Sequence, residues 1–137
     1  MFLCHDLIMI TADQLFAHAV GDYVIQSDWM ANEKTKQSFA AACHALSYAI
    51  PFLWFRPSFT AMAVIVGTHF IIDRWRLARY VCWFKNLASP REYRYKWSDC
   101  TGTGYHKDRP AWLAVWLLII ADNVMHVGIN ALALKYL

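Results

Sequence analysis

Four long apolar segments, separated by polar or proline-containing connections, dominate the hydrophobic pattern of the chain. They predict helices over residues 2–26, 38–55, 59–84 and 111–137. Pro57 and Pro110 stand just before the third and fourth segments, where proline is tolerated at a helix start. The second segment has no Lys, Arg, Asp or Glu, and between Pro110 and Leu134 the only formal charge is Asp122. Segments of this length and composition suit helices that cross a membrane.

The composition supports the same interpretation. Hydrophobic residues make up 58% of the chain, against roughly 45–50% in soluble domains, and charged residues only 17%, against about 25%. A chain of 137 residues has little interior in which to bury so much apolar surface. We therefore predict one all-α domain over residues 1–137, a four-helix integral membrane bundle of up-down-up-down topology. A soluble four-helix bundle is the alternative.

The net charge of +3 matters less than where the cations lie. Lys34 and Lys36 stand in the first connection, and only Arg56 and Lys135 lie outside the two basic regions. The other cations lie in or near a polar loop at about 85–110: Arg74, Arg76, Arg79, Lys85, Arg91, Arg94, Lys96, Lys107 and Arg109. If all four segments cross a bilayer, both basic connections lie on one side, which the positive-inside rule makes cytoplasmic. Apolar segments flank both regions, so we expect contact with lipid and not with nucleic acid.

Histidine and aspartate occur in pairs inside these apolar segments. The pairs are His18 with Asp22, His69 with Asp73 and, in reversed order, Asp122 with His126. Side chains four residues apart share one helix face, and the reversed order falls on the helix expected to run against the other two. We therefore predict one layer of histidines and one layer of carboxylates, about 6 Å apart along the axis. The second segment adds His44, followed four residues later by Tyr48.

Ionisable groups in apolar helices are costly, so each needs a partner or a function. Imidazole and carboxylate together suit Zn²⁺, Mn²⁺ or Fe²⁺, and a cation would relieve the repulsion among the aspartates. We predict a divalent metal, with zinc first, held by His18, Asp22, His44, His69, Asp73, Asp122 and His126. A hydrogen-bonded His–Asp network without metal is the alternative.

A bound metal can activate water, so the leading prediction is a membrane-embedded hydrolase acting on a phosphoester or lipid-type substrate. Asp22 and Asp73 would act in catalysis, and Arg76 or Lys34 would steady the anion. Two other classes remain open. One is a metal-stabilised scaffold that binds a membrane protein or a second copy of itself, and the other is an ion or proton transport component.

The residues HAVGDYVIQ at 18–26 begin a pattern that resembles a known family. The pattern continues with Trp29, Met30, Lys34, His44 and Tyr48, then with HFIID at 69–73 and with DNVMH at 122–126. It is similar to a membrane family of bacteria and phages, domain of unknown function 3307, whose closing motif is usually DQxxH. The resemblance covers most of the chain outside the basic loop. It implies a helical protein of the bacterial inner membrane and carries no settled activity.

A more distant likeness suggests chemistry. The HxxGD element is similar to one in the zinc-dependent P1 nuclease and phospholipase C class, which is all-α and binds a zinc cluster through HxxxD elements. That resemblance implies that His18, Asp22, His69 and Asp73 are zinc ligands. The class has a further histidine soon after its first motif, where this chain has Ser27 and Asp28.

Overall fold

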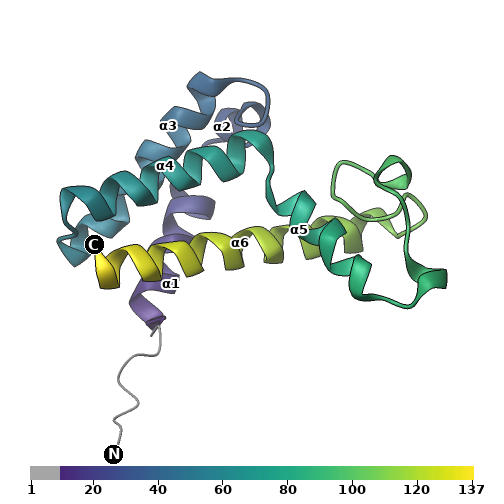
Figure 1. The fold of residues 1–137 in the computed structure, drawn as a ribbon. Helices are drawn as coiled ribbons and strands as arrows, with labels where there is room; N and C mark the ends of the chain where they lie inside the picture. The colour runs from purple at the N-terminus through teal and green to yellow at the C-terminus, as the bar shows by residue number, and fades with distance from the viewer. Residues whose placement is uncertain (1–9) are drawn as a thin grey trace, which may run out of the picture.

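The protein, seen in a computed structural model that describes residues 10–137, is built from helices (Figure 1). Its α-helices are α1 (Ala12–Ala19), α2 (Asp28–Glu33), α3 (Ser38–Tyr48), α4 (Phe59–Trp75), α5 (Ala78–Phe84) and α6 (Ala111–Tyr136). A π-helix covers Val20–Ile25, and 3-10 helices cover Ile50–Phe55, Lys85–Ala88, Arg91–Tyr93 and Trp97–Asp99. The described residues form no strand apart from an isolated bridge between Cys100 and His106. The all-α class predicted from the sequence is confirmed.

The first predicted helix consists of two helical types in the structure. Thr11 and Gln14 form a capping box that begins α1. Each side chain accepts a 3.3 Å hydrogen bond from the backbone N–H of the other residue. α1 then runs directly into the π-helix that ends at Ile25. Helix is thus confirmed from Ala12 to Ile25, while the predicted start at Phe2 lies outside the described residues.

The third predicted helix, over 59–84, is wrong as a single element. Arg76 takes a left-handed conformation with φ of 50°, which ends α4 and turns the chain into α5. The amide of Leu77 closes the helix end by donating to the carbonyl of Ile72 at 2.9 Å, a bond typical of a Schellman motif. Glycine is the usual residue in that conformation. Because an arginine stands there, the apolar pattern carried no signal for the break.

Two helical segments of the described chain are long and apolar enough to cross a membrane. They are Ser38–Phe55, in which α3 continues into a 3-10 helix containing Pro51, and Ala111–Tyr136, which is α6. The break at Arg76 shortens α4 to 17 residues, below the length that a spanning helix normally needs. Four spans were predicted from the sequence, and two of the four segments meet these criteria in the structure.

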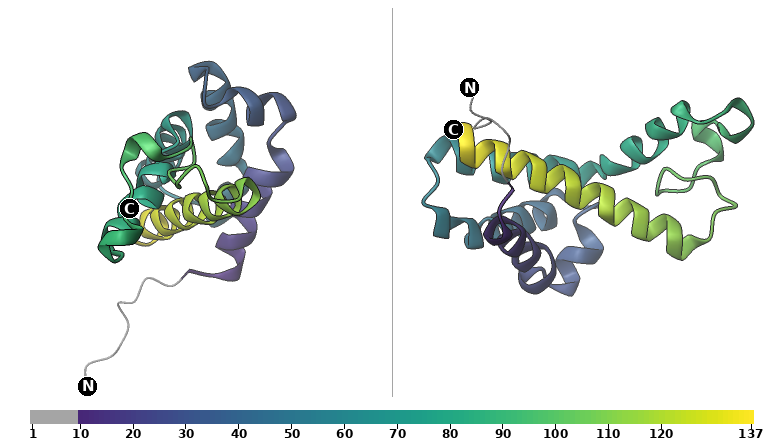
Figure 2. Two further views of the ribbon diagram at one scale, coloured as in Figure 1. Left: turned by 90° about the vertical axis from the view of Figure 1, so that its right-hand side faces the viewer. Right: turned by 90° about the horizontal axis from the view of Figure 1, so that it is seen from below.

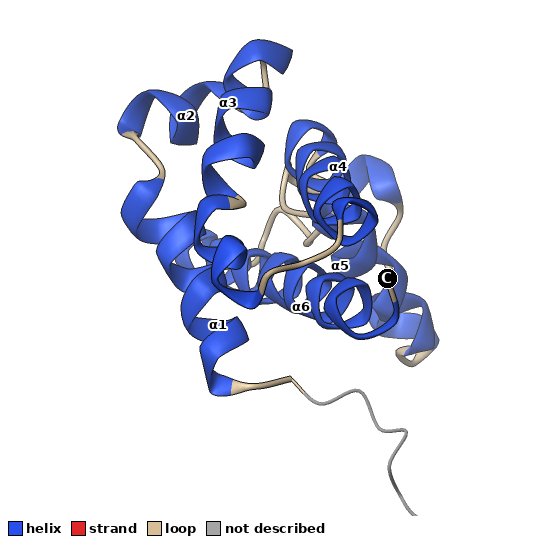
Figure 3. Cartoon of the chain, turned by 90° about the vertical axis from the view of Figure 1, so that its left-hand side faces the viewer, coloured by secondary structure: helices blue, strands red, loops and turns tan. Residues whose placement is uncertain are grey.

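The helices do not form the predicted up-down-up-down bundle. α4 and α6 lie side by side and run in opposite directions, and α3 packs on α4 (Figures 1 and 3). α1 instead crosses α6 steeply (Figure 2). α5 and the basic loop lie together at one end of the molecule, away from the C-terminus (Figure 2). At this crossing α1 contacts α6, and His18 and Tyr23 both bond Asn123 near the middle of α6.

Two apolar clusters form the core. One comprises Ala17, Tyr48, Phe52, Ala61, Ile65 and Ala133, and the other comprises Ala78, Cys82, Tyr105, Ala114 and Leu118. Along α4 and α6, residues 69–73 and 122–126 fall between the two clusters. The polar residues singled out by the sequence therefore occupy a buried layer, closed on both sides by apolar packing.

Candidate metal centre

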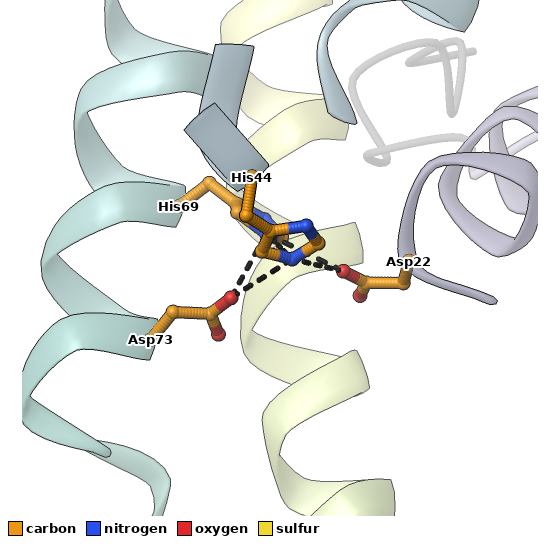
Figure 4. Close-up of side chains that lie close together, drawn as sticks. All are labelled: Asp22, His44, His69 and Asp73. Carbon is orange, nitrogen blue, oxygen red and sulfur yellow. Dashed lines mark hydrogen bonds and ion pairs between the residues drawn. The ribbon is translucent and has the colours of Figure 1, made fainter. Parts of the chain in front are cut away.

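Four buried side chains converge at the middle of this layer (Figure 4). Asp22 comes from the π-helix, His44 from α3, and His69 and Asp73 from one face of α4. The Nε2 atoms of the two histidines lie 2.9 Å apart. Each Nε2 atom also lies 3.1–3.3 Å from Asp22 Oδ1 and from Asp73 Oδ2. One atom of each side chain therefore points at a common centre.

The spacing of these four atoms matches a tetrahedral metal site. Zinc binds imidazole nitrogen and carboxylate oxygen at about 2.0–2.2 Å, which places neighbouring ligand atoms of a tetrahedron about 3.4 Å apart. The observed separations of 2.9–3.3 Å are close to that value, and all four atoms lie within 4.8 Å of one another. Two nitrogen and two oxygen donors can hold a divalent metal ion here.

Gly21 explains how Asp22 reaches this centre. A Cβ atom at Gly21 would lie 2.6 Å from the Tyr48 ring and 2.8 Å from the Tyr48 carbonyl oxygen, closer than real contacts allow. The absence of a side chain lets the π-helix press against α3, which carries both Tyr48 and His44. π-Helical turns are rare and are frequent at functional sites. The HxxGD spacing therefore reflects a close approach between two helices as well as a shared helix face.

The Gly21→Ala variant is expected to lose about 1–3 kcal/mol of stability, because the new methyl group overlaps a backbone carbonyl that cannot move aside cheaply. Thermal unfolding followed by circular dichroism in detergent measures the effect. Gly67→Ala in α4 is the matched control, since a Cβ there meets nothing within 4 Å. That control should keep its stability or gain up to about 1 kcal/mol. Equal melting temperatures for the two variants would contradict the role given to Gly21.

Tyr48 organises the histidines around the centre. Its ring stacks on His69 at a centroid distance of 3.7 Å, and its hydroxyl accepts a 2.6 Å hydrogen bond from Asn130 Nδ2. The Nδ1 atoms of His44 and His69 have no hydrogen-bond partner among the described residues, although histidine ligands usually donate from that nitrogen. Packing against the tyrosine therefore orients His69.

His18 lies outside the four-residue centre. The hydroxyl of Tyr48 lies 2.8 Å from His18 Nδ1, and Asn123 Oδ1 lies 2.8 Å from His18 Nε2. Because Tyr48 accepts from Asn130, the simplest pattern has Tyr48 donate to Nδ1 and His18 donate from Nε2. Both ring nitrogens are then used, with Nε2 3.5 Å from Asp22 Oδ2. The structure thus gives His18 contacts that hold Tyr48 and Asp22 in place.

Asp122 and His126 meet Asp73 in a second group beside the first. His126 Nε2 lies 3.4 Å from Asp73 Oδ1 and 3.4 Å from Asp122 Oδ2. The His126 ring also packs on His69, with centroids 4.1 Å apart. Separate layers of histidines and carboxylates were predicted, but His44 and His69 stand between Asp22 and Asp73. The histidine rings do lie together, whereas the carboxylates converge on them from different sides.

Lys34 is the unexpected member of the site. Its Nζ lies 2.8 Å from Asp73 Oδ2 and 3.2 Å from His44 Nε2, so the ammonium group touches the four-residue centre directly. The sequence pattern predicted only that Lys34 or Arg76 would steady a bound anion. Its ammonium supplies positive charge where two carboxylates would otherwise be poorly compensated.

A cleft of about 540 Å³ opens from this centre to the surface. Asp22, Asp73 and Asp122 lie along it, together with Lys36 and Arg76. The side chain of Arg76 makes no ion pair within the described part of the chain. The cleft is therefore lined by carboxylates and by cationic side chains that can bind an anion.

The carboxylates of Asp22 and Asp73 are charged in this environment, and both lie outside the two candidate membrane spans. Burial alone raises the pKa of a carboxyl group, because the charged form loses water. At Asp22, hydrogen bonds from His44 and His69 outweigh burial and lower the pKa below its ordinary value. At Asp73, hydrogen bonds from His126, His44 and His69 lower the pKa in the same way. Both groups are therefore ionised at neutral pH and ready to bind a cation.

Comparison with known proteins identifies a family and no activity. No curated protein and no solved structure matches the chain, so the likeness to the zinc-dependent P1 nuclease class stays a prediction. The model of a family described as protein of unknown function (DUF3307) matches residues 10–135. That match includes every residue of the two His/Asp groups, as well as Gly21 and Lys34. The chain belongs to the DUF3307 family.

Proposed function

We propose that this protein is a membrane-embedded, metal-dependent hydrolase that acts on phosphoester substrates. The observation that carries the proposal is the convergence of Asp22, His44, His69 and Asp73 at tetrahedral spacing beside a cleft with cationic residues. Mixed imidazole and carboxylate donors suit zinc, with manganese or iron as alternatives. When bound, such a metal supplies Lewis acidity and a water of lowered pKa.

The chain's own residues account for substrate binding and proton transfer. Arg76 has no ion-pair partner among the described residues, and its guanidinium can bind phosphate oxygens in the cleft. Lys36 adds a second positive charge to the same lining. Asp22 directs Oδ1 toward His44 and His69 and Oδ2 toward His18, so its second oxygen can accept a proton from water.

The surface supports placement in a membrane. Large apolar side chains are exposed on both candidate spans, and Trp54 and Trp116 are 84% and 60% accessible. Phe59, at the start of α4, is 90% accessible. Apolar surface on this scale favours lipid contact over water. With the basic loop on the cytoplasmic side, as the positive-inside rule requires, the inner membrane of a bacterium is the proposed location.

The test begins with protein extracted by detergent from the membrane fraction. Metal per chain is measured by mass spectrometry, and hydrolysis is followed with bis(4-nitrophenyl) phosphate and with 4-nitrophenyl phosphate. We expect stoichiometric metal, with hydrolysis that EDTA removes and Zn²⁺ or Mn²⁺ restores. Asp22→Asn should lower the rate at least about 100-fold, as expected for loss of a metal ligand.

Asp99→Asn is the matched control, since Asp99 is a half-buried aspartate in the basic loop and does not line the cleft. It should keep both metal and activity. Absence of metal after reconstitution would overturn the proposal, as would recovery of the folded protein in the soluble fraction. Stoichiometric metal without hydrolysis of either ester would favour the non-enzymatic scaffold.

A further inference from the structure

We infer that the site holds two divalent cations and that Asp73 bridges them; this inference rests on the metal-dependent function proposed above. The side chain of Asp73 is buried, and its two oxygens face different groups. Oδ2 lies 3.1 Å from the Nε2 atoms of both His44 and His69. Oδ1 lies 3.4 Å from His126 Nε2. A carboxylate whose two oxygens face different groups of ligands can bind one cation through each oxygen.

The second cation would be held by Asp73, Asp122 and His126. One ligand atom from each lies within 4.8 Å of the others, the same limit that defines the first group. His126 is buried and its ring is fixed against His69, so Nε2 has a defined direction. The Asp122 side chain is 26% accessible and lies along the cleft, which opens this group toward the surface.

The two positions differ in the number of protein ligands, and that difference assigns their roles. The first position has four donors, an arrangement typical of closed structural zinc sites. The second has three donors and faces the cleft, an arrangement typical of catalytic sites that keep one position for water or substrate. The substrate phosphate would therefore meet the cation between Asp122 and His126, with Arg76 on the same cleft.

Charge balance favours the same assignment. Three carboxylates, from Asp22, Asp73 and Asp122, stand around the two groups, and one divalent cation together with the Lys34 ammonium only neutralises them. A second divalent cation makes the floor of the cleft positive, as an anionic substrate requires. Paired metal ions of hydrolytic sites lie about 3.5–4 Å apart, a spacing that a bridging carboxylate supports.

The number of Mn²⁺ ions bound per chain tests the inference on the purified full-length protein. We expect two per wild-type chain, with the electron paramagnetic resonance spectrum of a spin-coupled pair. Asp122→Asn should bind one Mn²⁺ with an uncoupled spectrum and lose at least about 100-fold of the phosphoester hydrolysis. Asp122→Glu, which keeps a carboxylate, should recover the second ion, and Asp99→Asn should behave like wild type.

One uncoupled ion in both wild type and Asp122→Asn would overturn the two-cation inference and leave the proposed function standing. No ion in either protein would overturn both. If Asp122→Asn does not fold, the wild-type spectrum still decides between a coupled pair and a single ion.

Discussion

The Asp73→Asn variant is expected to purify without stoichiometric metal and to lose the part of its thermal stability that depends on metal. Asp73 belongs to both His/Asp groups, and its oxygens face His44, His69, His126 and Lys34. The amide keeps the size of the side chain but removes its charge and replaces one oxygen with a donor that cannot bind a cation. One metal group therefore loses its Asp73 ligand atom, and the other keeps only an uncharged carbonyl oxygen.

The size of this effect follows from ligand linkage. A ligand present at 1,000 times its dissociation constant stabilises the folded state by about 4 kcal/mol, which corresponds to roughly 14 °C in melting temperature for a chain of this size. Differential scanning fluorimetry with Zn²⁺ and with EDTA measures the difference. Wild type and Asp99→Asn should show that shift, whereas Asp73→Asn should melt at one temperature under both conditions. A metal-dependent shift retained by Asp73→Asn would contradict the site.

The Lys34→Met variant is expected to be less stable without metal and to bind metal more tightly. Without metal, the Lys34 ammonium balances the negative charge of Asp73, with Nζ 2.8 Å from Oδ2. Removing the ammonium leaves a buried carboxylate poorly paired. We expect a loss of about 1–3 kcal/mol, below the range for fully buried pairs because the Lys34 side chain is 19% exposed. With metal bound, the same ammonium repels the cation.

That repulsion predicts the gain in affinity. A unit charge and a divalent cation about 4 Å apart repel by about 2 kcal/mol even in water, so removing the lysine should tighten binding roughly thirtyfold. Competition for Zn²⁺ against a fluorescent chelator measures this change. Lys36→Met is the matched control, because Lys36 lies along the same cleft but pairs with Glu33. Equal or weaker binding by Lys34→Met would indicate that the His–Asp–Lys network is the functional state without metal.

Local spacing carried most of the information about the candidate site. His69 and Asp73 are four residues apart on α4, and their Nε2 and Oδ2 atoms lie 3.1 Å apart in the fold. Asp122 and His126 repeat this geometry on α6, with a separation of 3.4 Å. Helix geometry sets such distances, so the motif alone was sufficient to predict that each pair shares a face.

The sequence motifs did not predict which residues on different helices contact one another. Lys34 follows α2 and reaches Asp73 on α4 across 39 positions of sequence, a contact that no periodicity encodes. The left-handed turn at Arg76 has no glycine or proline to mark it, so the hydrophobic pattern predicted α4 and α5 as one helix. His18 shares a helix face with Asp22, but its two ring nitrogens contact Tyr48 and Asn123 and not the four-residue centre.

The amino-acid sequence by itself determined the helical class, the placement of His–Asp pairs on single helix faces, and the apolar character of two segments long enough to span a bilayer. These properties follow from composition and from a period of 3.6 residues, both of which are local. The tertiary structure alone decided which carboxylate oxygen faces which histidine, and that Asp73 belongs to both groups. Those relations depend on how closely helices approach, and Gly21 against Tyr48 sets one such distance by packing.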